Sequence, residues 1–419
     1  MVPYAQKVTR IPTAMGNPVD PFDTSCLEIN ATTHQLLQYY SRVFHRVIWY
    51  PEPSNLSVAK SDFQHDADFV LTSCLGDEMK MYSILSNMAS QLLNLGHLNL
   101  SQSTKFFIHK AIIATQRTIC NQPLLDQSML YWLFHLGCAE WYRSNFEAAL
   151  IHLQGMKSIY DRMGGTTVLD EGLRTVIALS DVFNSGALLV QPTFPCDYDP
   201  GRAPYLEQFG LQELFQSEVA NSVLLSSTCQ RIVPNEVHEF VNGLMEYAFL
   251  HENAVLRSPA ASENEEFTHW MHLRWLTMNQ KILALQLEDS RPMFISVAVG
   301  IWSNIILPLH VCLMLGEAMA VRLDHRMKAN TPNWEGHEEV LMWILMIGAM
   351  ATINHKSAHD SFLQEILSLI KHGNGCALFG NNMVDEEGLQ LFMGRFPSTK
   401  AIWPEVLVLG KKIEDLMHM

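Results

Sequence analysis

A helical stripe of apolar side chains that ends at two glycines is the feature that most constrains the fold of this chain. Within residues 139–165 the apolar positions recur every three or four residues: Tyr142, Phe146, Ala149, Leu150, Leu153, Met156, Tyr160 and Met163. This spacing places them on one face of an α-helix. Gly164 and Gly165 suit the left-handed conformation that ends many helices. No reactive side chain lies on the stripe, so it predicts packing rather than chemistry.

The same periodicity runs through most of the chain, whereas the alternation typical of strands is scarce. Helices are predicted over 34–50, 63–75, 77–95, 104–120, 125–142, 169–190, 234–250 and 267–287, with shorter helices within 205–229 and after 388. Ser103 is the expected N-cap of the fourth of these helices. We therefore predict an all-α fold, a large layered helical array of about fifteen helices. It fills residues 31–419 after a loosely ordered lead-in over residues 1–30, with a subdomain break near the proline-rich residues 191–204.

Two strongly apolar runs, 294–315 and 340–353, raise the question of membrane insertion. The first approaches the roughly 20 apolar residues that span a bilayer. Polar residues and a proline lie near its middle, namely Ser303, Asn304, Pro308 and His310. A proline interrupts a helix because it lacks an N–H and its ring clashes with the preceding turn. A buried core hairpin, divided near Pro308, is therefore the preferred interpretation, and no membrane association is expected.

The net charge argues against a protein that binds nucleic acid without sequence preference, and the cysteine spacing argues against a zinc-dependent DNA-binding protein. The chain has 419 residues and a formal net charge of −15, from 43 acidic and 28 basic residues. Tight sequence-independent binding to nucleic acid relies on Lys and Arg neutralising phosphates. The eight cysteines are scattered and form no C-x-x-C, so their spacing excludes a zinc ribbon or zinc cluster. Free thiols and the lack of an apolar signal segment predict a reducing compartment, cytosol or nucleus.

Two central segments of the chain, and a third more weakly, resemble a known family. The order F-x-A-A-L-x-H-L-x-G-M over residues 146–156, followed by Gly164-Gly165, is similar to the fungal-specific transcription factor domain. That domain is the regulatory part of many fungal zinc-cluster activators. The stretch LRTVIALSDVFNSGALLVQPTFPCDYDPG, residues 173–201, is a second match, and residues 391–407 are a weaker one. These motifs are structural rather than catalytic, and the resemblance implies a helical regulatory domain.

The resemblance also implies a function. It points to a transcriptional regulator or co-regulator of fungal type, located in the nucleus and shuttling with the cytoplasm, which acts through protein–protein contacts. Its expected partner is a DNA-binding transcription factor or the transcription machinery, and a secondary-metabolite pathway is a family-level suggestion. Because the family's zinc cluster is missing from this sequence, no direct contact with nucleic acid is expected.

Two other functions stay open on the sequence alone. The high apolar content, 48% of residues, could line a pocket for a small apolar ligand. Such a pocket would suit a helical biosynthetic enzyme or a small-molecule-sensing protein. No paired acidic metal motif is present, so an enzyme, a metal and a cofactor are not expected. Homodimerisation is a further expectation, because a charged fraction of 17% leaves apolar surface to cover.

The sharpest candidate for a ligand site is the charged turn after the proline-rich break. It holds Asp197, Asp199 and Arg202. A carboxylate–guanidinium pair that stabilises the turn is the plainer interpretation. A ligand-sensing loop is the alternative.

Other fragments resemble parts of known motifs, and each has a plainer interpretation. They are His65-Asp66, His238-Glu239, His337-Glu338, Gly373-x-Gly375, the pair His135 and Cys138, and His152. The H-D doublet suits a divalent cation but is also an ordinary solvated helix start. Both H-E pairs lack the second histidine of a zinc motif, and the glycine pair lacks the lysine of a phosphate loop. The three remaining residues fit core packing better than a nucleophile–base pair.

Overall fold

The computed structural model shows an all-α protein. It describes residues 25–45, 67–121, 126–165, 169–196, 199–202, 205–226, 229, 232–255, 257, 264–285, 290–307, 310–330, 332–372, 386–397 and 402–417. Over these residues it contains 17 α-helices and no strand. The predicted fold class is confirmed. The helix number exceeds the expected one partly because α17 (Lys356–His372), which the sequence analysis did not single out, is a full helix.

The described residues divide into two compact units. The first ends at Ser185 and also includes Thr193–Pro195, and the second comprises Gly186–Pro192 and the chain from Cys196 onward. The chain therefore passes from one unit to the other inside α8 (Glu171–Leu188) and again on either side of the short segment 193–195.

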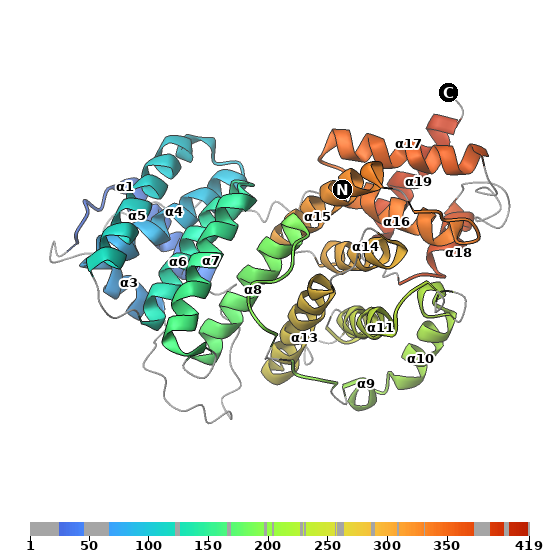
Figure 1. Ribbon diagram of the computed structural model, residues 1–419, viewed down its shortest axis with the longest axis horizontal. Helices are drawn as coiled ribbons and strands as arrows, with labels where there is room; N and C mark the ends of the chain where they lie inside the picture. Colours follow the sequence, from blue (N-terminus) through green and yellow to red (C-terminus); the bar gives the residue numbers. More distant parts are fainter. Residues whose placement is uncertain are drawn as a thin grey trace. The chain divides into compact units, whose positions relative to one another are not determined.

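The first unit is built around the central helix α4. Its helices are α1 (Ala31–Tyr39), α3 (Ala67–Leu75), α4 (Glu78–Asn94), α5 (Ser101–Asn121), α6 (Gln127–Tyr142), α7 (Phe146–Met163) and most of α8. α4 packs against α5 and α6, and α6 packs in turn against α7 (Figure 1). A π-helical turn, Tyr40–Phe44, continues α1. The buried face of α4 includes Met81, Ile84, Leu85 and Met88.

Side-chain caps fix where several of these helices begin. Asn30 accepts hydrogen bonds from the N–H groups of Thr32 and Thr33, both at 3.0 Å. Asp77 and Asp126 cap α4 and α6 in the same way. Such caps satisfy amide groups that have no partner within the helix. The cap predicted at Ser103 is wrong, because α5 already begins at Ser101.

The predicted apolar stripe forms α7 from Phe146 onward and ends where predicted, whereas its first member, Tyr142, is the last residue of α6. Gly164 follows the last residue with φ 102°, in the left-handed region. The stripe residues Ala149, Leu153, Met156 and Tyr160 are buried. Before α7, the Glu140 carboxylate accepts hydrogen bonds from Arg143 at 3.0 Å and Asn145 at 2.8 Å, which closes the turn from α6.

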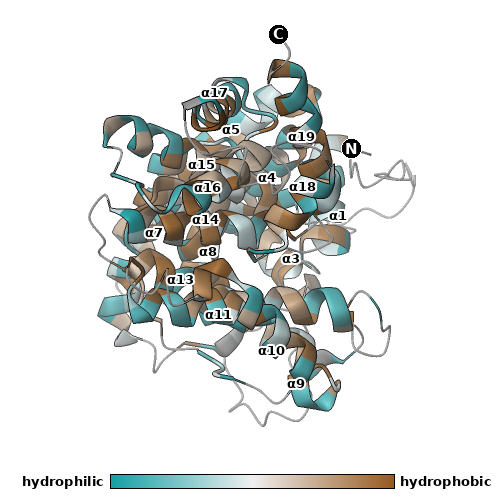
Figure 2. Ribbon diagram, turned by 90° about the vertical axis from the view of Figure 1, so that its right-hand side faces the viewer, coloured by the Kyte–Doolittle hydropathy of each residue, from teal (hydrophilic) through white to brown (hydrophobic). Residues whose placement is uncertain are grey.

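The second unit is built around α14. Its helices are α9 (Tyr205–Gln208), α10 (Gln212–Asn221), α11 (Asn235–Leu250), α13 (Glu265–Ala284), α14 (Arg291–Ile305), α15 (His310–Ala329), α16 (Glu338–Ala351), α17, α18 (Glu386–Met393) and α19 (Trp403–Met417). α14 packs against α11, α13, α15 and α16. The strongly apolar sequences of α14 and α16 are brown in Figure 2.

The two apolar runs are core helices of this unit. The first run is divided as predicted, since α14 ends at Ile305 and α15 begins at His310, while Pro308 itself lies outside the described residues. Among the described residues, no helix has the length and apolar character needed to cross a membrane.

Close backbone approach joins α16 to α17. A Cβ atom built on Gly348 would lie 2.5 Å from ring atoms of Phe362, which is fully buried. Real Cβ atoms essentially never approach another heavy atom so closely. Gly348 is therefore required for the distance between these two helices.

Candidate functional site

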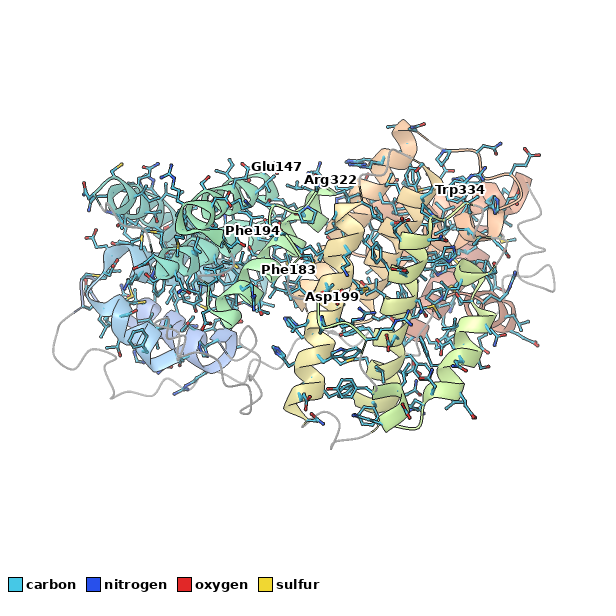
Figure 3. The ribbon with its side chains drawn as sticks, turned by 60° about the horizontal axis from the view of Figure 1, so that its bottom comes forward. Glu147, Phe183, Phe194, Asp199, Arg322 and Trp334 are labelled. Atoms are coloured by element: carbon cyan, nitrogen blue, oxygen red, sulfur yellow. The ribbon has the colours of Figure 1, made fainter. Side chains whose placement is uncertain are left out.

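The predicted charged turn meets two cations of α13. Asp197 lies outside the described residues, whereas Asp199 and Arg202 lie within 199–202. The Asp199 carboxylate pairs with Arg274 and with the Lys281 ammonium, both of which belong to α13. Figure 3 labels Asp199 beside the ribbon of this helix. Here the guanidinium partner of Asp199 is Arg274, which lies far from it in the sequence, while Arg202 is an exposed neighbour in the loop.

Hydrogen bonds hold the loop in register with α13. Asp199 Oδ1 accepts from the Gly201 N–H at 2.8 Å and lies 3.5 Å from Arg274 Nη1. Gly201 has φ 69°, a conformation that glycine adopts at little cost. The Trp270 indole N–H donates to the Gly201 carbonyl at 3.2 Å. Because Trp270, Arg274 and Lys281 are spaced by four and seven residues, they share one face of α13.

Arg274 extends the network into the core of the second unit. Its Nη2 lies 3.9 Å from Glu246 Oε2 on α11, and the two side chains are only 7% and 9% exposed. Among the described residues, Arg274 Nε has no hydrogen-bond partner. A buried guanidinium needs compensating charge, because its transfer out of water is costly. The two carboxylates supply that charge, so Arg274 ties α11, α13 and the loop together.

The pKa values of the two carboxyl groups shift in opposite directions. Burial alone would raise the pKa of Asp199, but hydrogen bonds from Lys281 and the Gly201 N–H, with the charges of Lys281 and Arg274, hold it below its usual value. Burial raises the pKa of Glu246, and the charges of Arg274 and Arg202 offset this only in part. Asp199 is therefore the carboxylate that stays ionised most firmly.

Glu246, Arg274 and Lys281 were not predicted from the sequence as members of this network. Their contribution depends on the packing of α11, α13 and the loop, which no local pattern encodes. One signal was present in the sequence. The spacing of Trp270, Arg274 and Lys281 places two cations and an indole on one side of a predicted helix.

The pair His135 and Cys138 lies on α6 of the first unit, with His135 in the core and Cys138 partly buried. His135 is fully buried, and its Nδ1 lies 2.9 Å from Asn87 Nδ2. Burial, with a smaller contribution from His45, lowers the pKa of His135 to about 3. Burial also raises the pKa of the Cys138 thiol well above its usual value. A neutral imidazole beside a protonated thiol is the reverse of an activated thiolate pair, so this geometry favours packing.

The remaining fragments do not form a site within the described residues. His65-Asp66 and Gly373-x-Gly375 lie outside them. His337 directly precedes α16, and Glu338 accepts a hydrogen bond from the Gly336 N–H. Burial lowers the pKa of His152 and of His238. In the part of the chain that the structure describes, no group of three or more His, Cys, Asp or Glu side chains could hold a metal ion.

A buried aspartate in α8 is a structural residue that the sequence analysis did not identify. Asp181 is fully buried and accepts hydrogen bonds from the Thr193 and Phe194 N–H groups, each at 2.8 Å. The Ser185 hydroxyl donates to it at 3.1 Å. Phe194 packs edge-on against Tyr160 of α7, with ring centroids 5.2 Å apart. Asp181 thus fixes the proline-bearing turn that follows α8; Figure 3 labels Phe194.

Comparisons of the chain with protein-family models, curated proteins and solved structures found no match.

Proposed function

We propose that this chain is a transcriptional regulator or co-regulator of fungal type that acts in the nucleus through protein–protein contacts. It contacts a DNA-binding transcription factor or the transcription machinery, rather than DNA directly, and its target genes belong to a secondary-metabolite pathway. It is not an enzyme under this proposal. The sequence resemblance is the source of this proposal, and the geometry of the resembling segments supports it.

The observation that carries the proposal is how the two resembling segments are used in the structure. Residues 146–156 form the start of α7, whose stop is the left-handed Gly164. Residues 173–201 form most of α8 and the turn that Asp181 fixes through two backbone N–H groups. Both segments thus build the helical framework, and the Asp199 carboxylate at the end of the second segment pairs with Arg274 and Lys281 of α13. This is the use expected of a regulatory domain whose recognisable features are structural.

The ionic groups of the second unit also support a non-catalytic role. Asp324 of α15 accepts hydrogen bonds from Lys328 at 2.7 Å and from Ser361 of α17 at 2.6 Å. Arg274 is likewise committed to Glu246 and Asp199. An active site holds titratable groups ready for a substrate, whereas these groups join helices to one another.

A tethering experiment tests the proposal. The full chain is fused to an unrelated DNA-binding domain in a fungal reporter strain, with the DNA-binding domain alone as control. A several-fold rise or fall in reporter expression is expected. The variant Leu153→Asp, which places a charge at a buried position of α7, should lose the effect. A reporter that does not respond in either direction, with the fusion present in the nucleus, would refute the proposal.

A small-molecule-sensing role is the second candidate, and it is favoured by the Nε of buried Arg274, which donates a hydrogen bond to no described residue. The rings of Tyr205 and Trp270 lie 5.1 Å apart beside this network. A small apolar ligand with a carboxylate could displace Asp199 from Arg274 and Lys281. Calorimetric titration with aromatic carboxylic acids tests this role. Asp199→Asn should strengthen binding under it, and equal weak heats for both proteins would exclude it.

A further inference from the structure

The exposed face of α5 has a charge opposite to that of the chain as a whole. The protein carries a net charge of −15, yet α5 holds Lys105, Lys110 and Arg117 and contains neither Asp nor Glu. Within the described residues, neither Lys105 nor Lys110 forms an ion pair. Two large apolar side chains lie on the same exposed face, with Phe106 50% and Ile113 38% exposed.

Helix geometry arranges these residues in an ordered stripe. At about 100° per residue, Phe106 and Ile113 point within about 20° of each other. By the same measure Lys110 and Arg117 lie on one side of this apolar ridge, at about 20–40° from Phe106. Lys105 lies on the other side, about 100° from Phe106. We call Lys105, Phe106, Lys110, Ile113 and Arg117 the α5 stripe.

Packing fixes the direction in which the α5 stripe faces. The buried residues of α5 are Thr104, Phe107, Ile108, Ala111, Ala114 and Thr115, and they lie on the opposite side of the helix. α5 packs against α4. The Phe106 ring is supported by Phe107 and by Tyr82 of α4, at centroid distances of 5.6 and 6.2 Å. Lys110 Nζ lies 5.7 Å from the Phe106 centroid, within cation–π range.

We infer that the α5 stripe binds an acidic amphipathic helix of a partner protein, with an apolar face set between carboxylates. Charge complementarity identifies this occupant, because cations flank the apolar ridge on both sides. Arg117 already pairs with the Glu78 carboxylate of α4 at 3.3 Å, with both side chains largely exposed. Exposed pairs of this kind are worth little, so a partner carboxylate can replace Glu78. The inference rests on the protein-contact part of the proposed function.

The same observations argue against DNA and against an anionic membrane as the ligand of the α5 stripe. Binding to DNA requires many phosphate contacts, and the α5 stripe offers three cations within a strongly acidic protein. The exposed apolar side chains of Phe106 and Ile113 would also find no apolar partner on a phosphate backbone. An anionic membrane surface attracts clusters of four to eight basic residues, more than this helix presents.

A peptide-binding experiment tests the inference. The probe is a fluorescent synthetic helix of about 18 residues, with Leu and Phe on one face and Glu on both flanks. Its matched control replaces every Glu by Gln. Fluorescence anisotropy with the full chain should show binding of the acidic probe, and at least about tenfold weaker binding of the control. Raising the salt concentration should weaken the first and hardly affect the second.

Charge-matched variants locate the binding surface. The variant Lys105→Glu/Lys110→Glu/Arg117→Glu should weaken probe binding by about tenfold or more. The control Lys356→Glu/Lys411→Glu/Lys412→Glu changes the net charge equally at exposed positions of α17 and α19, and it should bind as the unchanged protein does. The variant Phe106→Ser/Ile113→Ser removes the apolar ridge and should cost about fivefold. Circular dichroism confirms that each variant is folded.

Cys120 provides a positional readout. It is exposed and follows Arg117 by three residues on the same side of α5. Bound probe should slow alkylation of Cys120 several-fold, as followed by mass spectrometry, while alkylation of Cys196 in the second unit should be unchanged.

The outcomes that overturn the inference are specific. Equal binding of the probe to both triple variants, or of the Glu and Gln peptides to the protein, would exclude the α5 stripe as an acidic-helix site. Duplex DNA or phosphatidylserine vesicles that bind through these cations while the peptide does not would assign the surface to those ligands instead. Dimers in sedimentation velocity that the α5 triple variant abolishes would assign it to a second copy. A silent tethered reporter with intact peptide binding would refute the transcriptional role alone.

Discussion

Arg274 in α13 and Arg117 in α5 carry the same guanidinium group in opposite settings. Arg274 is buried and lies between two carboxylates, so its charge is used to join a loop and two helices. Arg117 is largely exposed and meets a single carboxylate that is itself exposed. Burial thus separates a cation that holds the fold together from cations that remain available to a partner. The distinction depends on the surroundings of the two side chains, since both are arginines on long helices.

The largest expected effect is the loss of the buried cation. Arg274→Met should lower the free energy of unfolding by about 3–5 kcal/mol at pH 7.5, because it leaves Glu246 as an unpaired buried carboxylate. The loss should shrink toward pH 5, since burial raises the pKa of Glu246 and protonation relieves the charge. Urea denaturation at both pH values measures this change.

Arg202→Ala is the matched control for that variant, because Arg202 is an exposed arginine in the loop that carries Asp199. Its effect should stay within about 0.5 kcal/mol. Equal losses for Arg202→Ala and Arg274→Met would show that burial is not what distinguishes the two arginines.

Asp181 tests whether a buried carboxylate in the first unit behaves like those around Arg274. Asp181→Ala removes the acceptor of the Thr193 and Phe194 N–H groups. The free energy of unfolding should fall by about 2–4 kcal/mol, since each orphaned buried donor costs about 1–3 kcal/mol. Amide hydrogen exchange should speed up at residues 193 and 194. Unchanged exchange there would show that the turn holds without this carboxylate.

Titration of Glu218 should make the free energy of unfolding depend on pH, with an effect of intermediate size. Burial, with the charge of Glu252, raises the pKa of Glu218 to about 7. The folded protein therefore keeps a proton that the unfolded chain releases near the ordinary glutamate pKa of 4.5. Stability should decrease as pH rises from that value through 7, by about 1–2 kcal/mol after allowance for partial exposure.

Glu218→Gln removes this titration. The midpoint of urea denaturation should then change less between pH 5 and pH 8 than it does in the unchanged protein. A variant with an equal pH dependence would assign the titration to another group.

The smallest effect on stability is expected at the α5 stripe. Lys105→Gln/Lys110→Gln/Arg117→Gln should change the free energy of unfolding by about 0.5 kcal/mol or less, because exposed charges contribute little to folding. Thermal denaturation compares this variant with the unchanged protein. A loss comparable to that of Arg274→Met would mean that these cations hold the fold, and it would weaken their assignment to a partner.

Sequence periodicity predicted the fold well wherever one helical face is buried. The end of α7 at Gly164 and the division between α14 and α15 follow from backbone properties of glycine and proline, which act locally. α17 carried a similar signal, with Phe362, Ile366 and Ile370 at helical spacing, but its polar first turn hid it. The extra turn at the start of α5 shows how a 3-10 segment, Leu98–Leu100, can shift a helix boundary.

The candidate site could be predicted only in part. Asp199 was identified from its charged turn, but its partners lie more than 70 residues away on α13. Such pairings arise from how the helices pack, and α13 alone does not reveal which of its cations is buried. The α5 stripe could not be predicted from the sequence for the same reason. A set of basic and apolar side chains can be assigned to a binding surface only when the opposite face of the helix is known to be buried.

The contact of Gly348 with Phe362 determines how α16 and α17 can move. Where backbone lies directly against an aromatic ring, neither helix can slide or tilt without first separating from the other. The hairpin should consequently respond to stress as one cooperative block, so that amide protons along α16 and α17 exchange in a single step. A motion within this second unit would then carry α16 and α17 together and leave the contact between them unchanged.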